Sequence, residues 1–124
     1  MSFSSILRSI VDGCGGGLGA ALMGNDGIAI DQVTASVPSH TVGGDDVSAA
    51  GIEFGRILEE IRKASDALSG GAVSEVVVSL ARFQLVLRVV DDETFVVLAL
   101  APDGNLGKAR YLIRRHLLAL REEL

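Results

Sequence analysis

Tryptophan is absent from this chain of 124 residues, cysteine occurs once, and the aromatic residues are four phenylalanines and one tyrosine. So few aromatic rings leave little surface on which nucleic-acid bases or sugars could stack. The single cysteine, Cys14, has no partner for an intramolecular disulfide, which is typical of a reducing cytoplasm. The two histidines, His40 and His116, lack further ligands at workable spacing, so we expect no metal site.

Positive charge and long hydrophobic runs are also scarce. The formal net charge of −5 disfavours general nucleic-acid binding, because contacts to phosphates dominate that affinity. No apolar run reaches the ~18 residues that a membrane-spanning helix requires. Residues 1–13 lack a basic segment ahead of an apolar core, which argues against a secretory signal. We therefore expect a cytoplasmic protein without nucleic-acid partners and without integral membrane contact.

The length of the chain and its pattern of apolar, capping and glycine residues predict a single domain, residues 1–124, of the α+β class. Apolar residues make up 48% of the chain, enough to fill a core, and capping residues and glycines mark the ends of the elements. We expect a helix from Ser2 to the glycines at 13–17, strands 18–23 and 28–33 around a Gly24–Gly27 turn, a long helix from Asp45 or Asp46 to near Leu68 before Gly70 and Gly71, strands 74–80, 83–90 and 95–101, and a last helix capped by Asn105.

These elements predict a five-stranded antiparallel sheet flanked by three helices. The last three strands form a meander, because the links between them are too short for a crossover helix. Strand 95–101 is the most uniformly apolar, so we place it in the centre, and strand 74–80 at an edge. An uncovered edge is a template for pairing. Pairing with the same strand of a second subunit about a two-fold axis would cover it and bring the two long helices together.

The predicted dimer interface therefore combines one face of the long helix with the edge strand. On that helix Gly51 and Gly55, four positions apart, allow a close approach, either of a second helix or of the chain's own sheet; the sequence leaves both open. The predicted interface residues are Val47, Ala50, Gly51, Phe54, Gly55, Ile57, Leu58, Ile61, Ser74, Val76, Val78 and Leu80.

No residues form a recognisable catalytic constellation. The glycines at 13–17 follow a helix and precede Leu18 and Gly19, whereas a phosphate-binding loop needs Lys and then Ser or Thr there. Cys14 lies on the apolar face of a helix end, and the carboxylates at 91–93 are consecutive residues of a turn. We expect no enzyme activity and no cofactor.

Three polar regions are candidates for binding a partner. The hairpin tip offers Asn25, Asp26 and Ile28, and the polar face of the long helix offers a second set. That set is Arg56, Glu59, Glu60 and Lys63. The last helix carries five of the eleven basic residues, namely Lys108, Arg110, Arg114, Arg115 and Arg121, which either form a solvated face or contact an anionic partner or membrane. An ordinary solvent turn and a solubilising helix face are the alternatives for the first two regions.

The element order and several motifs resemble the Roadblock/LC7 family over nearly the whole chain. They are the hairpin Gly24–Ile28, the long helix that ends in glycines, and Asp103–Gly107 ahead of Arg110 and Arg114. Within the family the chain is most similar to the bacterial MglB/MglC-like group, and there to the short MglC type. That likeness lies in the opening Met-Ser-Phe, Met23–Ile28, Val73–Val76 and Gly104–Tyr111.

The resemblance implies a homodimer built from the long helix and the third strand. It also implies a non-enzymatic adaptor in a polarity and gliding-motility system run by a Ras-like small GTPase of the MglA type, with recruitment to the cell poles. The chain lacks the C-terminal extension of MglB-like proteins beyond Leu124, which favours binding of an MglB-like Roadblock protein. Direct activation of the GTPase, or an anion- or membrane-binding scaffold that uses the basic last helix, are the alternatives.

Overall fold

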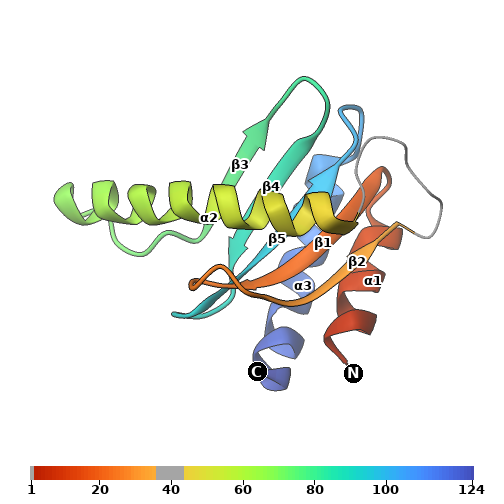
Figure 1. Ribbon diagram of the computed structural model, residues 1–124, viewed down its shortest axis with the longest axis horizontal. Coiled ribbons are helices and arrows are strands. Elements are labelled where there is room, and N and C mark those ends of the chain that lie inside the picture. Colours follow the sequence, from red (N-terminus) through yellow and green to blue (C-terminus); the bar gives the residue numbers. More distant parts are fainter. Residues whose placement is uncertain (1, 36–43) are drawn as a thin grey trace.

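The predicted element order is confirmed in a computed structural model, which describes residues 2–35 and 44–124 (Figure 1). The elements are α1 (Phe3–Gly13), β1 (Gly17–Gly24), β2 (Ala29–Thr34), α2 (Gly44–Ala67), β3 (Glu75–Ser79), β4 (Gln84–Val89), β5 (Thr94–Leu100) and α3 (Leu106–Glu123). His40 lies outside the described residues. No helix in the described part of the chain combines the length and the hydrophobicity needed to cross a bilayer.

All strand pairs are antiparallel, and the sheet order is β2-β1-β5-β4-β3. The central position of β5 and the edge position of β3 are therefore confirmed. Val97 of β5 lies between Ala21 of β1 and Leu87 of β4, and every residue of β5 is buried. A strand covered on both faces by helices and on both edges by strands is apolar along most of its length, and its one polar residue, Thr94, lies at its start, where its hydroxyl bonds to Asp91.

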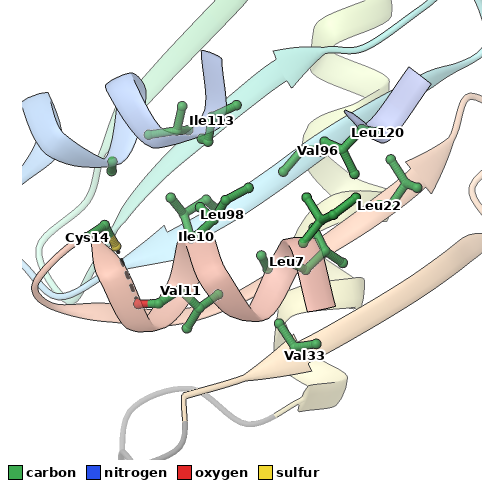
Figure 2. Close-up of a cluster of buried hydrophobic side chains, with 14 of the residues drawn as sticks. Leu7, Ile10, Val11, Cys14, Leu22, Val33, Val96, Leu98, Ile113 and Leu120 are labelled. Atoms are coloured by element: carbon green, nitrogen blue, oxygen red, sulfur yellow. Dashed lines mark hydrogen bonds between the residues drawn. The ribbon is translucent and has the colours of Figure 1, made fainter. Parts of the chain in front are cut away.

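The helices lie on both faces of the sheet: α1 and α3 cover one face and α2 crosses the other (Figure 1). Because successive side chains of a strand point to opposite faces, Val96 and Leu98 belong to the core under α1 and α3, and Val97 to the core under α2. Figure 2 shows the first core, in which Ile10 of α1 and Ile113 of α3 meet these strand residues.

The predicted caps of the first and last helices are confirmed. The Ser2 hydroxyl accepts a hydrogen bond from the Ser5 N–H at 3.2 Å, and the Asn105 side chain accepts one from the Lys108 N–H at 3.0 Å. Cys14 follows α1 as its C-terminal cap, fully buried, with Sγ 3.5 Å from the Val11 carbonyl oxygen (Figure 2). Burial raises the pKa of the Cys14 thiol, so the residue packs as a small apolar side chain.

The predicted cap of the long helix is wrong. Helix α2 already includes Gly44, so Asp45 and Asp46 lie within it and not ahead of it. At the other end the N–H of Gly70 donates to the Ser65 carbonyl at 2.8 Å, and the N–H of Ser69 to the Asp66 carbonyl at 3.2 Å. This is a Schellman motif, and the residue with left-handed backbone is Ser69, with φ of 54°, instead of a glycine.

Candidate protein-binding surfaces

Helix α2 places part of the predicted interface inside the chain's own core. Val47, Gly51 and Leu58 are buried against the sheet. A Cβ atom on Gly51 would lie 2.8 Å from Cγ of Met23, and one on Gly55 would lie 3.0 Å from Cζ of Phe95. The two glycines therefore let α2 approach its own sheet, one of the two alternatives that the sequence left open. Val47 and Leu58 are almost wholly buried, and Gly51 and Gly55 face the sheet, so these four residues offer less surface to a second subunit than the rest of the predicted interface.

The other predicted interface residues of α2 form an exposed or half-buried apolar flank, which consists of Ala50, Phe54, Ile57 and Ile61. These positions recur at three- and four-residue steps, so they share one side of the helix. The side chain of Ile57 is 46% exposed. Ala50 and Phe54 pack against the same buried cluster as the half-buried Val76 and Val78 of β3. The apolar flank and strand β3 thus border the same buried cluster, and Ser74 and Leu80 are exposed at the two ends of the strand.

The two edges of the sheet differ in how they are protected. In β2, Leu22 pairs with Asp31 and Met23 with Ala29, so Ile30 has no partner in β1 and forms a bulge. The hydroxyl of Ser4 donates to Oδ2 of Asp31 at 2.7 Å, and this bond ties β2 to α1. Strand β3 pairs regularly with β4 along its whole length, and within the described residues no strand pairs with its outer edge. Bulges and charged side chains hinder pairing at an edge, so β3 is the edge open to a second strand.

A groove of 590 Å³ lies on the opposite flank of α2, between that helix and the hairpin tip. This hairpin groove is lined by Gly24, Asn25, Asp26, Gly27, Gly51, Ile52, Gly55, Arg56, Leu58, Glu59, Arg62, Asp92 and Phe95. It brings together two of the predicted binding regions, since Asn25 and Asp26 of the tip face Arg56 and Glu59 of α2. In Figure 1 the tip of the β1–β2 hairpin and strand β3 lie on opposite sides of α2.

Three predicted binding residues lie outside the hairpin groove. Ile28 is exposed and lines a separate hollow of 320 Å³ with Ile30 and residues of the β4–β5 turn. Glu60 and Lys63 form an exposed ion pair of 3.1 Å farther along α2. Such a pair contributes little to stability, so both side chains are available for another contact.

The hairpin tip is held in place by the neighbouring turn. The N–H of Asn25 donates to the Glu93 carbonyl at 2.8 Å, and Nδ2 of the same residue donates to the Asp92 carbonyl at 2.8 Å. Oδ1 of Asp26 accepts from the Ile28 N–H at 3.0 Å, which closes the turn. Asn25 therefore joins two turns that are far apart in sequence, a role that no local pattern indicates.

The groove presents charged groups of both signs, which suit recognition of a polar surface. Arg62 lies 3.3 Å from Glu59, and Arg56 lies 3.5 Å from Glu53, so cations and carboxylates alternate along α2. The residues that line the groove in the described chain include no serine, threonine, cysteine, histidine, tyrosine or lysine. Carboxylates and guanidinium groups are therefore its only ionisable groups.

On the other face of the sheet, Glu75 of β3 links the edge strand to α3. Its carboxylate contacts Nε of Arg110 and lies 3.6 Å from Nη1 of Arg88. The Glu75 side chain is only 9% exposed, and Nε of Arg88 is buried without an acceptor among the described residues. This arrangement was not predicted from the sequence, because its three members are distant along the chain.

Comparison with known proteins supplies the family. The chain matches no protein-family model and no curated protein. Among solved structures it is 37% identical to MglC from Myxococcus xanthus over 100% of both chains, with a TM-score of 0.70. It shares the fold of a Roadblock/LC7 domain from Streptomyces avermitilis, at 15% identity over 98% of this chain and 97% of that one and a TM-score of 0.84. It also shares the fold of the gliding protein MglB from Thermus thermophilus, at 16% identity over 97% of this chain and 86% of that one and a TM-score of 0.83.

The residues, the fold and the relatives agree. The hairpin Gly24–Ile28, the long α2 and the capped α3 are the features that resemble Roadblock proteins, and the structure arranges them around an antiparallel sheet with β5 at its centre. With 37% identity to MglC over the full length of both chains, this chain belongs to the Roadblock/LC7 family and, within it, to the MglB/MglC-like group.

Proposed function

We propose that this chain is a non-enzymatic, dimeric Roadblock adaptor in a polarity and gliding-motility system run by a Ras-like small GTPase of the MglA type. In this proposal it acts by binding an MglB-like Roadblock protein in the cytoplasm. Its membership of the MglB/MglC-like group supports the assignment, and one of its structural relatives is described as a gliding protein.

The observation that carries the proposal is the open edge of β3 beside the apolar flank of α2. Pairing of β3 with its copy about a two-fold axis would satisfy the outer backbone groups of the strand. It would also bury the apolar flank, whose exposure is otherwise unfavourable. The proposed interface residues that a partner could reach are Ala50, Phe54, Ile57, Ile61, Ser74, Val76, Val78 and Leu80.

The hairpin groove provides a second surface that the dimer interface leaves uncovered, because it lies on the other flank of α2. Its volume of 590 Å³ is enough for several partner side chains. Asn25 and Asp26 offer amide and carboxylate groups, and Arg56 and Glu59 offer both charges. We propose this groove as the contact for the MglB-like protein, with Ile28, Glu60 and Lys63 at its margin.

Two isoleucines of α2 make a matched test of these surfaces. Ile57 lies on the apolar flank and is 46% exposed, whereas Ile52 lines the hairpin groove and is 39% exposed. We expect Ile57→Asp to yield a monomer, because a carboxylate would be buried without a partner at the interface. Ile52→Asp should remain dimeric and lose affinity for the MglB-like protein. Light scattering gives the mass, titration calorimetry gives the affinity, and far-UV circular dichroism verifies folding.

A folded Ile57→Asp variant that stays dimeric would refute the proposed interface. Single-turnover GTP hydrolysis by an MglA-type GTPase tests the adaptor role separately. An adaptor should alter the rate only when an MglB-like protein is present. Acceleration by this chain alone would instead identify direct GTPase activation.

A further inference from the structure

Helix α3 exposes two large apolar side chains on the side that faces away from the sheet. Tyr111 is 52% exposed and Leu118 is 65% exposed. They are seven positions apart, so they lie on the same side of the helix, about 10 Å from each other along its axis. The core-facing stripe of α3, which consists of Ala109, Ile113, Leu117 and Leu120, points the opposite way.

Basic residues flank this pair on both sides. The helical positions place Arg110 and Arg114 along the side toward β3, where Arg110 contacts Glu75, and place Lys108 and Arg115 along the other side. Within the described residues no carboxylate lies within 4 Å of Lys108, Arg114 or Arg115. Helix α3 carries five cations against Glu122 and Glu123, in a chain whose net charge is −5. The charge of this helix is therefore opposite in sign to that of the rest of the chain.

We infer that the outer face of α3, defined by Lys108, Arg110, Tyr111, Arg114, Arg115 and Leu118, binds an acidic amphipathic segment of a partner protein. Tyrosine and arginine are enriched at protein interfaces, where an apolar centre is ringed by polar groups. Carboxylates on such a segment would form charge-assisted hydrogen bonds with the guanidinium groups while an apolar side chain covers Tyr111 and Leu118. This site does not depend on the dimer or on the hairpin groove, because α2 and α3 lie on opposite faces of the sheet (Figure 1).

A protein segment fits this face better than a membrane does. A helix that lies on a bilayer inserts a broad apolar face, but the apolar stripe of α3 is buried in the core, as Ile113 and Leu120 show in Figure 2. Only Tyr111 and Leu118 remain for insertion. A second copy of the chain fits poorly as well, because two such faces would bring like charges together.

The test uses the full chain and a fluorescent synthetic peptide with leucines along one helical side and glutamates beside them. A peptide with glutamine in place of every glutamate is the uncharged probe. We expect the acidic peptide to bind, the uncharged peptide to bind at least tenfold more weakly, and added salt to weaken binding of the acidic peptide. Fluorescence anisotropy gives the dissociation constants.

Two variants locate the site. Arg114→Glu with Arg115→Glu reverses two charges on α3, and Arg82→Glu reverses an exposed charge in the turn between β3 and β4, outside all the proposed binding surfaces. The α3 variant should weaken binding about tenfold, as expected when two exposed charge contacts of up to ~1 kcal/mol are lost, and the Arg82 variant less than twofold. Equal effects of the two variants, absence of binding, or equal affinity for both peptides would overturn the inference. So would sedimentation with phosphatidylglycerol vesicles in the absence of acidic-peptide binding.

Discussion

Replacement of Glu75 by glutamine tests whether the contact between β3 and α3 holds the edge strand in position. Glu75 is the one carboxylate within 4 Å of both Arg88 and Arg110 among the described residues. Glutamine keeps the shape of the side chain and one acceptor oxygen, but it removes the charge. The substitution therefore isolates the ionic part of the contact.

The expected cost lies between two limits. Removing one partner of a fully buried ion pair costs about 3–5 kcal/mol, because the other charge stays buried and uncompensated, whereas an exposed pair contributes about 0–1 kcal/mol. The side chains of Glu75 and Arg88 are 9% and 20% exposed, which is near the buried limit, but that of Arg110 is 48% exposed and can be rehydrated. We therefore expect Glu75→Gln to lower the free energy of unfolding by about 2 kcal/mol.

Urea unfolding followed by circular dichroism at one fixed protein concentration measures this cost. With a slope of about 2 kcal/mol per molar urea, the midpoint should fall by about 1 M. Glu60→Gln is the matched control, because it removes the same charge from the exposed pair with Lys63. That variant should shift the midpoint by about 0.3 M or less. Equal shifts for Glu75→Gln and Glu60→Gln would show that burial of Glu75 does not strengthen its ion pairs.

Two further predictions concern the turn at Asp91 and the close approach of the backbone at Gly16 to that at Gly104. The Thr94 hydroxyl donates to Oδ1 of Asp91 at 2.7 Å and holds the pKa of that carboxyl below its ordinary 3.8. The ionised Asp91 therefore stabilises the folded state fully above pH 3.8, and this stabilisation is lost as the pH falls through the lowered pKa. Asp91→Asn should therefore reduce the loss of stability in acid. If the urea midpoint of the variant fell with pH as steeply as that of the parent chain, the prediction would be wrong. A Cβ on Gly16, where φ is +88°, would lie 2.7 Å from Cα of Gly104, so Gly16→Ala should cost about 2–3 kcal/mol. Gly27→Ala, with φ of +87° and open space around it, should cost about 1 kcal/mol, and equal melting temperatures would refute the difference.

Local patterns predicted the elements, the central position of β5 and the edge position of β3, because each depends on residues that are close in the sequence. Strand β5 could be placed centrally because residues 95–101 are all apolar, and a strand that is apolar along its length is usually covered on both faces. Ser2 and Asn105 could be recognised as caps because a capping side chain bonds to an N–H three residues ahead. The glycines after α2 marked its end to within a few residues, although the left-handed position is Ser69.

Contacts between distant residues could not be predicted in the same way. The spacing of Gly51 and Gly55 showed that something approaches α2 closely, but not that Met23 and Phe95 do so. The meeting of Glu75 with Arg88 and Arg110 depends on where α3 crosses the sheet, and that position leaves no local pattern in the sequence. The hairpin groove is a partial success, since the two predicted regions that form it were identified separately and only the fold joins them.

The hairpin groove, the outer face of α3 and the β3 edge are separate surfaces, so an adaptor of this shape would have room for more than one contact at a time. The hairpin groove and the outer face of α3 lie on opposite faces of the sheet, and the β3 edge lies on neither (Figure 1). If β3 pairs with its copy, the dimer presents two grooves on one face and two basic α3 faces on the other. A partner with two acidic segments would then bind its second segment as an intramolecular step, so its affinity could exceed that of one segment by about 10²–10⁴. A monomeric Ile57→Asp variant should keep the affinity for a single acidic segment and lose this enhancement.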